Sequence, residues 1–273
     1  MKNYIPLFLI CLVTSLLFFS CQKVIDVDLN AAAPQIVIEG SVCDQPGPYY
    51  INLTQTVNFS ETNSFPPVTG ALVKITDNLG STDILTELTP GSYASSSLQG
   101  LPGNTYTLSV ASNGKNYSSV SAMPPPVDID SLSISTVSNG FGGPRKRLVA
   151  HFHDPAGVAN FYRFKVNHYF VVNHVIQYWV EQKGISITSD RFQDGTNMAY
   201  NLSGRDNKLI SGDSIAVSIQ AIDKGVYDYL RTLGQSDNGP QSATPANPTP
   251  NITSGALGYF NAYAIRVKGI VVP

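Results

Sequence analysis

The stretch that decides the fold class is residues 160–172, NFYRFKVNHYFVV. Apolar and polar side chains alternate along this run, and a period of two is typical of a β-strand with one buried face. The stretch therefore predicts a half-buried strand. Its buried face would carry Tyr162, Phe164, Val166, Phe170 and Val172, and its solvent face Arg163, Lys165 and Asn167.

Similar runs occur on both sides of this stretch. Residues 215–221 repeat the alternation, and between Gln35 and Met123 short apolar runs recur about every 10 to 15 residues, separated by Gly, Pro or Asn. About seven such runs in roughly 90 residues predict a β-sandwich. The clearest of them are Ile36–Ile38, Tyr50–Leu53, Leu72–Ile75 and Tyr106–Val110.

Three consecutive prolines, Pro124 to Pro126, divide the chain. Proline cannot continue a central strand, and a run of prolines favours an extended spacer. We therefore expect a β-sandwich domain over residues 35–123, a proline linker over 124–126, and a second β-rich, sandwich-like domain over 127–273.

The second domain also carries a helical pattern. Val226, Leu230 and Leu233 follow the spacing of one helix face and predict one short amphipathic helix. Residues 183–212 are polar and predict an irregular excursion at one end of the sheet. The Pro- and Asn-rich residues 236–253 predict a long loop, either ordered or flexible.

The overall composition limits the possible functions. Of 273 residues, 42% are hydrophobic, which is enough for real cores, and only 13% are charged. The formal net charge of −2 argues against a nucleic-acid binder that relies on positive charge. The 22 glycines and 18 prolines suit a turn-rich β protein.

The N-terminus has the features of a lipoprotein signal. Lys2 precedes an apolar run, Ile5–Phe19, whose length of about 15 residues is too short to span a bilayer as a helix. Ser20 precedes Cys21, although Phe18 occupies a position where leucine is usual. We therefore expect residues 1–20 to be the signal peptide, Cys21 to carry acyl chains such as palmitate, and residues 21–34 to be the lipidated tether. The alternative is an ordinary cleaved signal that leaves Cys21 unmodified.

The other cysteines fit this interpretation. Cys11 would leave with the signal, so Cys43 would remain without an intramolecular disulfide partner. Because Cys43 ends an apolar strand pattern, we expect a buried, inert thiol.

Two resemblances add to these arguments. Gly70–Ile75, Gly91–Tyr93 and Gly103–Leu108 together resemble an Ig-like or prealbumin-like sandwich of the carboxypeptidase-regulatory type, which implies a spacer or binding platform and no activity. The whole mature chain resembles the Bacteroidota lipoproteins classed as domain of unknown function 4249. The segments that carry this likeness are Ser20–Cys21, Val24–Leu29, Val37–Gly40, Gly91–Tyr93, Asp128–Leu132 and Asn251–Phe260.

The family resemblance implies a location and a partner. It implies a lipid-anchored outer-membrane protein, at the cell surface or on the periplasmic face, that often accompanies a TonB-dependent receptor. Asp-Ser-apolar triplets at Ser131 and Ser214 also resemble Bacteroidota O-glycosylation sites.

Catalytic and metal motifs are weak in this sequence. Gly212-Asp213-Ser214 resembles the Gly-Asp-Ser block of ester hydrolases, but it precedes a predicted strand and the sequence contains no Asp-x-x-His. His151 and His153 would share one strand face, and a cluster with His168 and His174 is geometrically conceivable. We expect ordinary surface or cross-strand histidines, and therefore no catalytic residue, metal site or cofactor.

Aromatic residues give the candidate contacts. Trp179 is the single tryptophan, and it would be partly exposed if the opposite face, with Tyr178, were the core; otherwise a helix or the first domain covers it. Arg145–Arg147 would form a solvated turn or contact an acidic or phosphorylated partner. Glycines beside aromatic residues near the C-terminus would contact a ligand or pack at a sheet corner: Gly255, Leu257, Gly258, Tyr259 and Phe260.

These observations lead to one main functional hypothesis. The chain would be a non-enzymatic outer-membrane lipoprotein, an accessory or substrate-binding partner of a TonB-dependent receptor. The alternative is an adhesive or envelope-structural β-sandwich lipoprotein.

Overall fold

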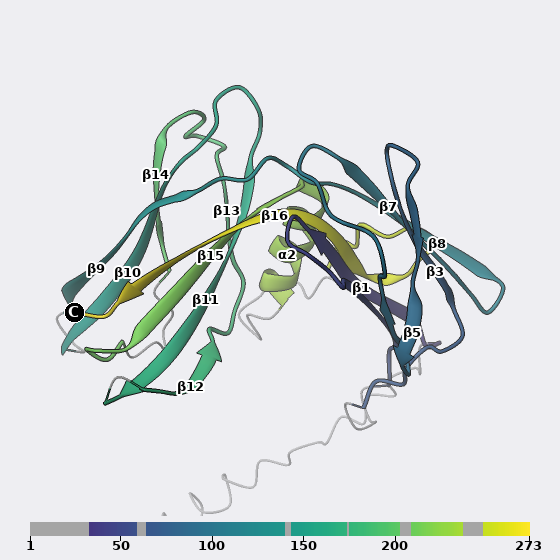
Figure 1. Ribbon diagram of the computed structural model, residues 1–273, viewed down its shortest axis with the longest axis horizontal. Coiled ribbons are helices and arrows are strands. Elements are labelled where there is room, and N and C mark those ends of the chain that lie inside the picture. Colours follow the sequence, from purple (N-terminus) through teal and green to yellow (C-terminus); the bar gives the residue numbers. More distant parts are fainter. Residues whose placement is uncertain (1–32, 59–63, 140–142, 174, 203–208, 237–247) are drawn as a thin grey trace, which may run out of the picture. The chain divides into compact units, whose positions relative to one another are not determined.

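In the described residues, one long β-sheet carries two large hydrophobic cores and a smaller one beneath helix α2 (Lys224–Ser236) (Figure 1). The computed structural model describes residues 33–58, 64–139, 143–173, 175–202, 209–236 and 248–273. The predicted signal peptide, Cys21, the tether up to residue 32, and His174 lie outside the described residues. Residues 34–273 form one compact unit.

The strands before the prolines are short and follow the apolar runs of the sequence. In the described residues they are β1 (Ile36–Cys43), β2 (Tyr50–Gln55), β3 (Leu72–Asp77), β4 (Thr82–Ile84), β5 (Thr86–Thr89), β6 (Ser92–Ala94), β7 (Thr105–Ser112) and β8 (Lys115–Ala122).

The elements after the prolines are longer. They are β9 (Ile129–Asn139), β10 (Gly143–His153), β11 (Phe161–Val172), β12 (Val175–Glu181), β13 (Ser186–Ser189), β14 (Asn197–Asn201), β15 (Ser214–Ile222), helix α2 (Lys224–Ser236) and β16 (Leu257–Val271).

Strand β16 joins the two parts of the long sheet, whose order is β12-β11-β15-β16-β1-β2-β6-β5, with β13 also paired to β11. Its first half pairs in parallel with β1, from Val37–Leu257 to Cys43–Tyr263. Its second half pairs antiparallel with β15, from Ala221–Ala264 to Ser214–Val271. Strand β16, drawn in yellow in Figure 1, therefore belongs to both parts of the long sheet.

Each part of the sheet buries one face against a smaller sheet. The sheet β4-β3-β7-β8 closes a first core, and the sheet β14-β10-β9 closes a second. Each large apolar side chain that is fully buried in these cores contributes about 1.5–3 kcal/mol of hydrophobic free energy. The first core contains Ile38, Ile51, Ile75, Leu108 and Phe260; the second contains Phe152, Tyr162, Phe164, Val217 and Ile219.

These layers confirm the predicted fold class: mainly β, sandwich-like, with a short helix. The first core also includes Ile252 and the β16 residues Phe260, Ala262 and Ala264. The segment 127–273 thus contributes to the core around residues 35–123 as well as to its own.

Helix α2 covers the opposite face of the long sheet. It buries Val226, Tyr229 and Leu230, in agreement with the helical spacing in the sequence. The Tyr229 ring stacks on Tyr259 of β16, with 4.9 Å between ring centroids. Asp223 caps the helix start, because its carboxylate accepts the Val226 N–H at 2.8 Å.

Two expectations about the second half are wrong. Residues 183–212 contain β13 and β14 instead of only irregular chain. The sequence shows no clear alternation of apolar and polar residues at β14, because this strand is five residues long and buries only Met198. On β11, Val172 lies on the predicted inner face but is 56% exposed.

Candidate functional site

Strand β12 forms an exposed apolar edge of the long sheet. It lies at the end of the strand order and pairs with β11, and no other described strand pairs with it. Every described residue of β12 is exposed, although five of the seven are apolar or aromatic. We call these five residues the edge patch: Val175, Ile176, Tyr178, Trp179 and Val180.

Aromatic rings lie on both faces of the edge patch. On one face Tyr178 stacks against Phe170, with 4.4 Å between ring centroids; on the other, the centroid of Trp179 lies 6.4 Å from that of Tyr169. Tyr178 and Trp179 are each 57% exposed. Trp179 is therefore exposed, and the alternative that a helix or the first domain covers it is wrong. The condition set for its exposure, a core on the Tyr178 side, is not met either, because both faces of β12 are exposed.

The glycine–aromatic segment near the C-terminus is mainly a packing feature. Gly258 has a φ of +93° and lies so close to β1 that a Cβ atom would sit 2.1 Å from the Ile38 carbonyl oxygen. Phe260 is fully buried in the first core, so its proposed ligand contact is corrected: its side chain faces away from any surface. Leu257 is half-buried, and Gly255 has a φ of +76° with open space around its Cα.

Tyr259, in contrast, lines a pocket. This pocket has a volume of about 490 Å³ and lies on the sheet face that also carries α2, where β16, β1 and β2 meet. Cys43 is another lining residue and is only partly buried. The expectation of a buried thiol is therefore only partly met, because Cys43 packs against the first core and also lines the pocket.

The described histidines lie apart and have different partners. The His151 ring lies 2.9 Å from Ser133 Oγ, and the His153 ring lies 2.9 Å from Asn197 Oδ1. These are cross-strand contacts, as the sequence predicts. His168 Nε2 lies 2.8 Å from Asp213 Oδ2.

The His168–Asp213 pair does not extend to Ser214. His168 is in register with Ile215, whose side chain is in the second core, whereas Ser214 is one residue earlier and points to the other face of the sheet. The Asp213 carboxylate also accepts the Val171 N–H at 3.0 Å. The Gly-Asp-Ser block thus fixes the ends of β11 and β15 and does not place Ser214 beside the histidine.

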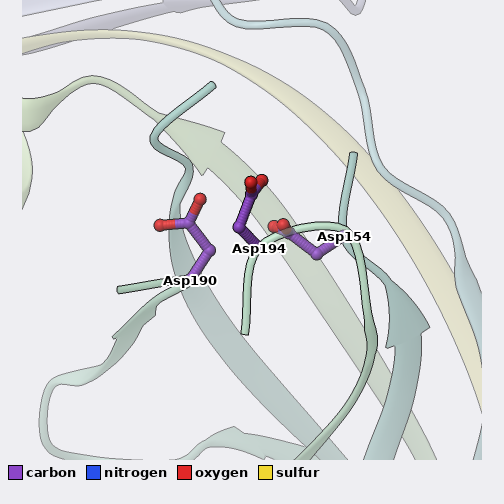
Figure 2. A group of neighbouring side chains, drawn as sticks. All are labelled: Asp154, Asp190 and Asp194. Carbon is purple, nitrogen blue, oxygen red and sulfur yellow. The ribbon is translucent and has the colours of Figure 1, made fainter. Parts of the chain in front are cut away.

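The structure also brings together an acidic cluster that the sequence does not indicate. Carboxylate oxygens of Asp154, Asp190 and Asp194 lie within 4.8 Å of one another between two loops (Figure 2). Asp154 is fully buried and Asp190 is 5% exposed. Oxygen donors of this kind are those that Ca²⁺ prefers, so these three residues are the described set that could hold a cation.

The same carboxylates have protein partners. Asp154 accepts the Tyr162 O–H at 2.5 Å and the Gly195 N–H at 3.0 Å. Burial, and next the hydrogen bond to Asp154, raise the pKa of Tyr162. Backbone N–H groups of the facing loops donate to the other two carboxylates. The cluster therefore fastens two loops together. Asp190 and Asp194 follow Asp154 by 36 and 40 positions in the chain, and no local sequence pattern indicates that the three residues meet.

The comparison with protein families finds one match, over residues 22–268, to the domain of unknown function DUF4249. The chain belongs to this family. In this DUF4249 protein the match begins directly after Cys21 and includes the first core, most of the second core and the shared strand β16 as far as Lys268. A search of curated proteins found no match. In the described residues, no helix has the length and apolar character to span a membrane.

The remaining predicted positions of the DUF4249 protein lie on its surface or close to it. Ser131 is exposed on β9, and Ser214 is half-buried at the start of β15. Arg145 and Arg147 are exposed, but they lie on strand β10. The expected turn is therefore wrong for these residues, because β10 pairs with β9 from Gly143 to Phe152.

Proposed function

We propose that this DUF4249 protein is a non-enzymatic, lipid-anchored protein of the outer membrane of Bacteroidota, and that it acts as an accessory or substrate-binding partner of a TonB-dependent receptor. The edge patch carries the protein-binding part of this proposal. Soluble monomers rarely expose a contiguous set of large apolar side chains, and such sets usually mark interaction sites.

The geometry of β12 suits a protein partner. An edge strand has backbone N–H and C=O groups that can pair with a strand of another chain, while Tyr178 and Trp179 offer apolar area on the two faces. Tyrosine and tryptophan are enriched among the residues that dominate binding free energy at interfaces. The partner would thus gain both hydrogen bonds and buried aromatic area.

The membrane part of the proposal rests on the N-terminal sequence. Lys2, the apolar run Ile5–Phe19 and Ser20–Cys21 support a signal peptide followed by a lipidated cysteine. Several acyl chains on one cysteine give stable anchoring. Protease treatment of intact cells distinguishes the two faces of the membrane, because only a surface protein would be digested.

Co-purification from cells tests the partner. Tagged full-length protein, solubilised in detergent, should enrich a TonB-dependent receptor, and the double variant Tyr178→Ser/Trp179→Ser should reduce that enrichment at least ten-fold. Phe192→Ser is the matched control, because Phe192 is an aromatic residue with 89% exposure outside the edge patch. Wild-type protein that runs alone in repeated preparations would contradict the proposal. If deletion of the gene then changed attachment and left nutrient uptake intact, the adhesive or structural alternative would replace it.

A further inference from the structure

The pocket beside α2 has a chemical character that the proposed partner does not explain. Its walls include the aromatic rings of Tyr50, Tyr259 and Tyr263, which come from β2 and β16. Residues of β1 also line it, among them Glu39 and Cys43, and Cys43 packs against the first core as well.

Glu39 is the only charged side chain among the residues that line this pocket. It makes no hydrogen bond or ion pair with the residues that the structure describes, and it is exposed. The neighbouring acid, Asp44, differs, because it accepts a hydrogen bond from Arg266 Nη1 at 2.6 Å. The pocket therefore has one negative charge without a partner.

Nearby groups do not neutralise that charge. Burial, and next the Cys43 thiol, raise the pKa of Tyr263, so this phenol is neutral at physiological pH. Arg163 acts electrostatically on Tyr263 but does not line the pocket. The side chain of Asn52 supplies a further neutral hydrogen-bonding group at the rim.

A carboxylate among aromatic rings is the arrangement that attracts organic cations. The face of a tyrosine ring carries negative electrostatic potential and attracts an ammonium or guanidinium group within about 6 Å. A pocket of about 490 Å³ is within the usual size range for small-molecule sites. We propose that the tyrosine-lined pocket binds the ammonium or guanidinium group of a small organic cation, with Glu39 as its counter-charge.

The probes for the test are N-acetyl-lysine amide and N-acetyl-arginine amide, with N-acetyl-norleucine amide as the neutral isostere. Full-length acylated protein in non-ionic detergent is titrated, and saturation transfer from protein to probe is measured by NMR. Both cations should bind at least ten-fold more tightly than the isostere. Glu39→Gln should remove this difference. Asp128→Asn, which removes an exposed carboxylate outside the pocket, should retain it.

A second measurement locates the bound probe. With Cys11 removed and Cys21 acylated, Cys43 is the free thiol of the mature chain, and it lines the pocket. The cationic probes should slow its alkylation by iodoacetamide, and Tyr50→Leu should weaken that protection. Equal binding of cations and isostere, or an unchanged preference in Glu39→Gln, would overturn the proposal. Because the protein is tested alone, either result is independent of the receptor partnership.

Discussion

Ser121 and Asp223 are 102 residues apart and form a hydrogen bond of 2.5 Å between Ser121 Oγ and Asp223 Oδ2. Ser121 Oγ also accepts the Ala262 N–H at 2.9 Å, and the other oxygen of Asp223 caps helix α2. A single buried hydroxyl thus joins strand β8, the start of α2 and strand β16.

Removal of this hydroxyl should destabilise the fold. In Ser121→Ala the buried Ala262 N–H would lose its side-chain partner, and Asp223 would lose one donor. We expect the free energy of unfolding to fall by about 1–3 kcal/mol, the usual penalty for a buried group left without a hydrogen bond. Urea denaturation measures the change. Ser135→Ala, at an exposed serine of β9, is the control and should change stability by less than about 0.5 kcal/mol. Equal stability of the two variants would contradict the prediction.

Alanine substitutions at Gly258 and Gly255 should distinguish the cost of a strained backbone from the cost of steric overlap. Both have positive φ, but only at Gly258 would a Cβ atom meet another strand, 2.1 Å from the Ile38 carbonyl oxygen. We expect Gly255→Ala to cost about 1–2 kcal/mol, from the left-handed backbone alone. Gly258→Ala should cost more than about 4 kcal/mol or prevent folding, because β1 and β16 would have to separate. Thermal unfolding of both variants provides the comparison, and similar melting temperatures would rule out this explanation.

Acid should weaken the first sandwich through Asp83. Burial alone would raise the pKa of this carboxyl, but hydrogen bonds from the N–H groups of Ser97, Leu98 and Ser96 lower it below its ordinary value of 3.8. Since the folded pKa lies below the unfolded one, the carboxylate stabilises the fold at neutral pH. That contribution should be lost as the pH falls below about 4 and through the folded pKa.

The matched variant for this pH dependence is Asp83→Asn. It lacks the titrating group, so its free energy of unfolding, measured by urea denaturation between about pH 2.5 and 6, should vary less than that of the wild type. An equally steep acid loss in the variant would assign the effect to other carboxyls, such as Asp44, whose pKa is also lowered.

The acidic cluster predicts a stabilising substitution. Asp194 is its exposed member, and an asparagine there keeps an oxygen that can accept the Gly157 N–H. Asp194→Asn removes one of three neighbouring negative charges, so in EDTA the free energy of unfolding should rise by about 1 kcal/mol. Chemical denaturation with and without Ca²⁺ is the measurement. A loss of stability in EDTA would show that repulsion among the carboxylates is not the dominant effect.

Lipidation predicts a change of location. Cys21→Ala removes the residue that would carry the acyl chains, so the protein should move from the membrane fraction to the soluble fraction and lose incorporation of labelled palmitate. Cys43→Ala is the control and should remain in the membrane fraction. An unlabelled wild type would support the alternative of an ordinary cleaved signal.

Local sequence patterns were sufficient for single elements. The alternation in residues 160–172 correctly places Tyr162, Phe164 and Val166 in a core, because period two follows directly from strand geometry. The spacing of Val226 and Leu230 predicts α2 for the same reason. The strands β13 and β14 within the polar residues 183–212 were not predicted, because short strands bury too few side chains to produce a clear alternation of apolar and polar residues.

Contacts between distant segments could not be predicted in this way. The register of β1 with β16 joins residues more than 200 positions apart, such as Val37 and Leu257, and nothing in either strand encodes its partner. The same reason explains why Asp154 was not connected with Asp190. A lone tryptophan on an alternating run, Trp179, is visible in the sequence, but its exposure is not, because exposure on both faces of β12 depends on where the cores end.

The change of partner along β16 has a mechanical consequence. Strand β1 is the first described strand of the chain and lies inside the long sheet, and β12 forms one end of that sheet. If Cys21 carries the proposed lipid anchor, tension between β1 and a molecule held at β12 would be carried through the adjacent hydrogen-bonded strands β1, β16, β15, β11 and β12. The three prolines lie outside this route, so they would bear none of that load as a hinge.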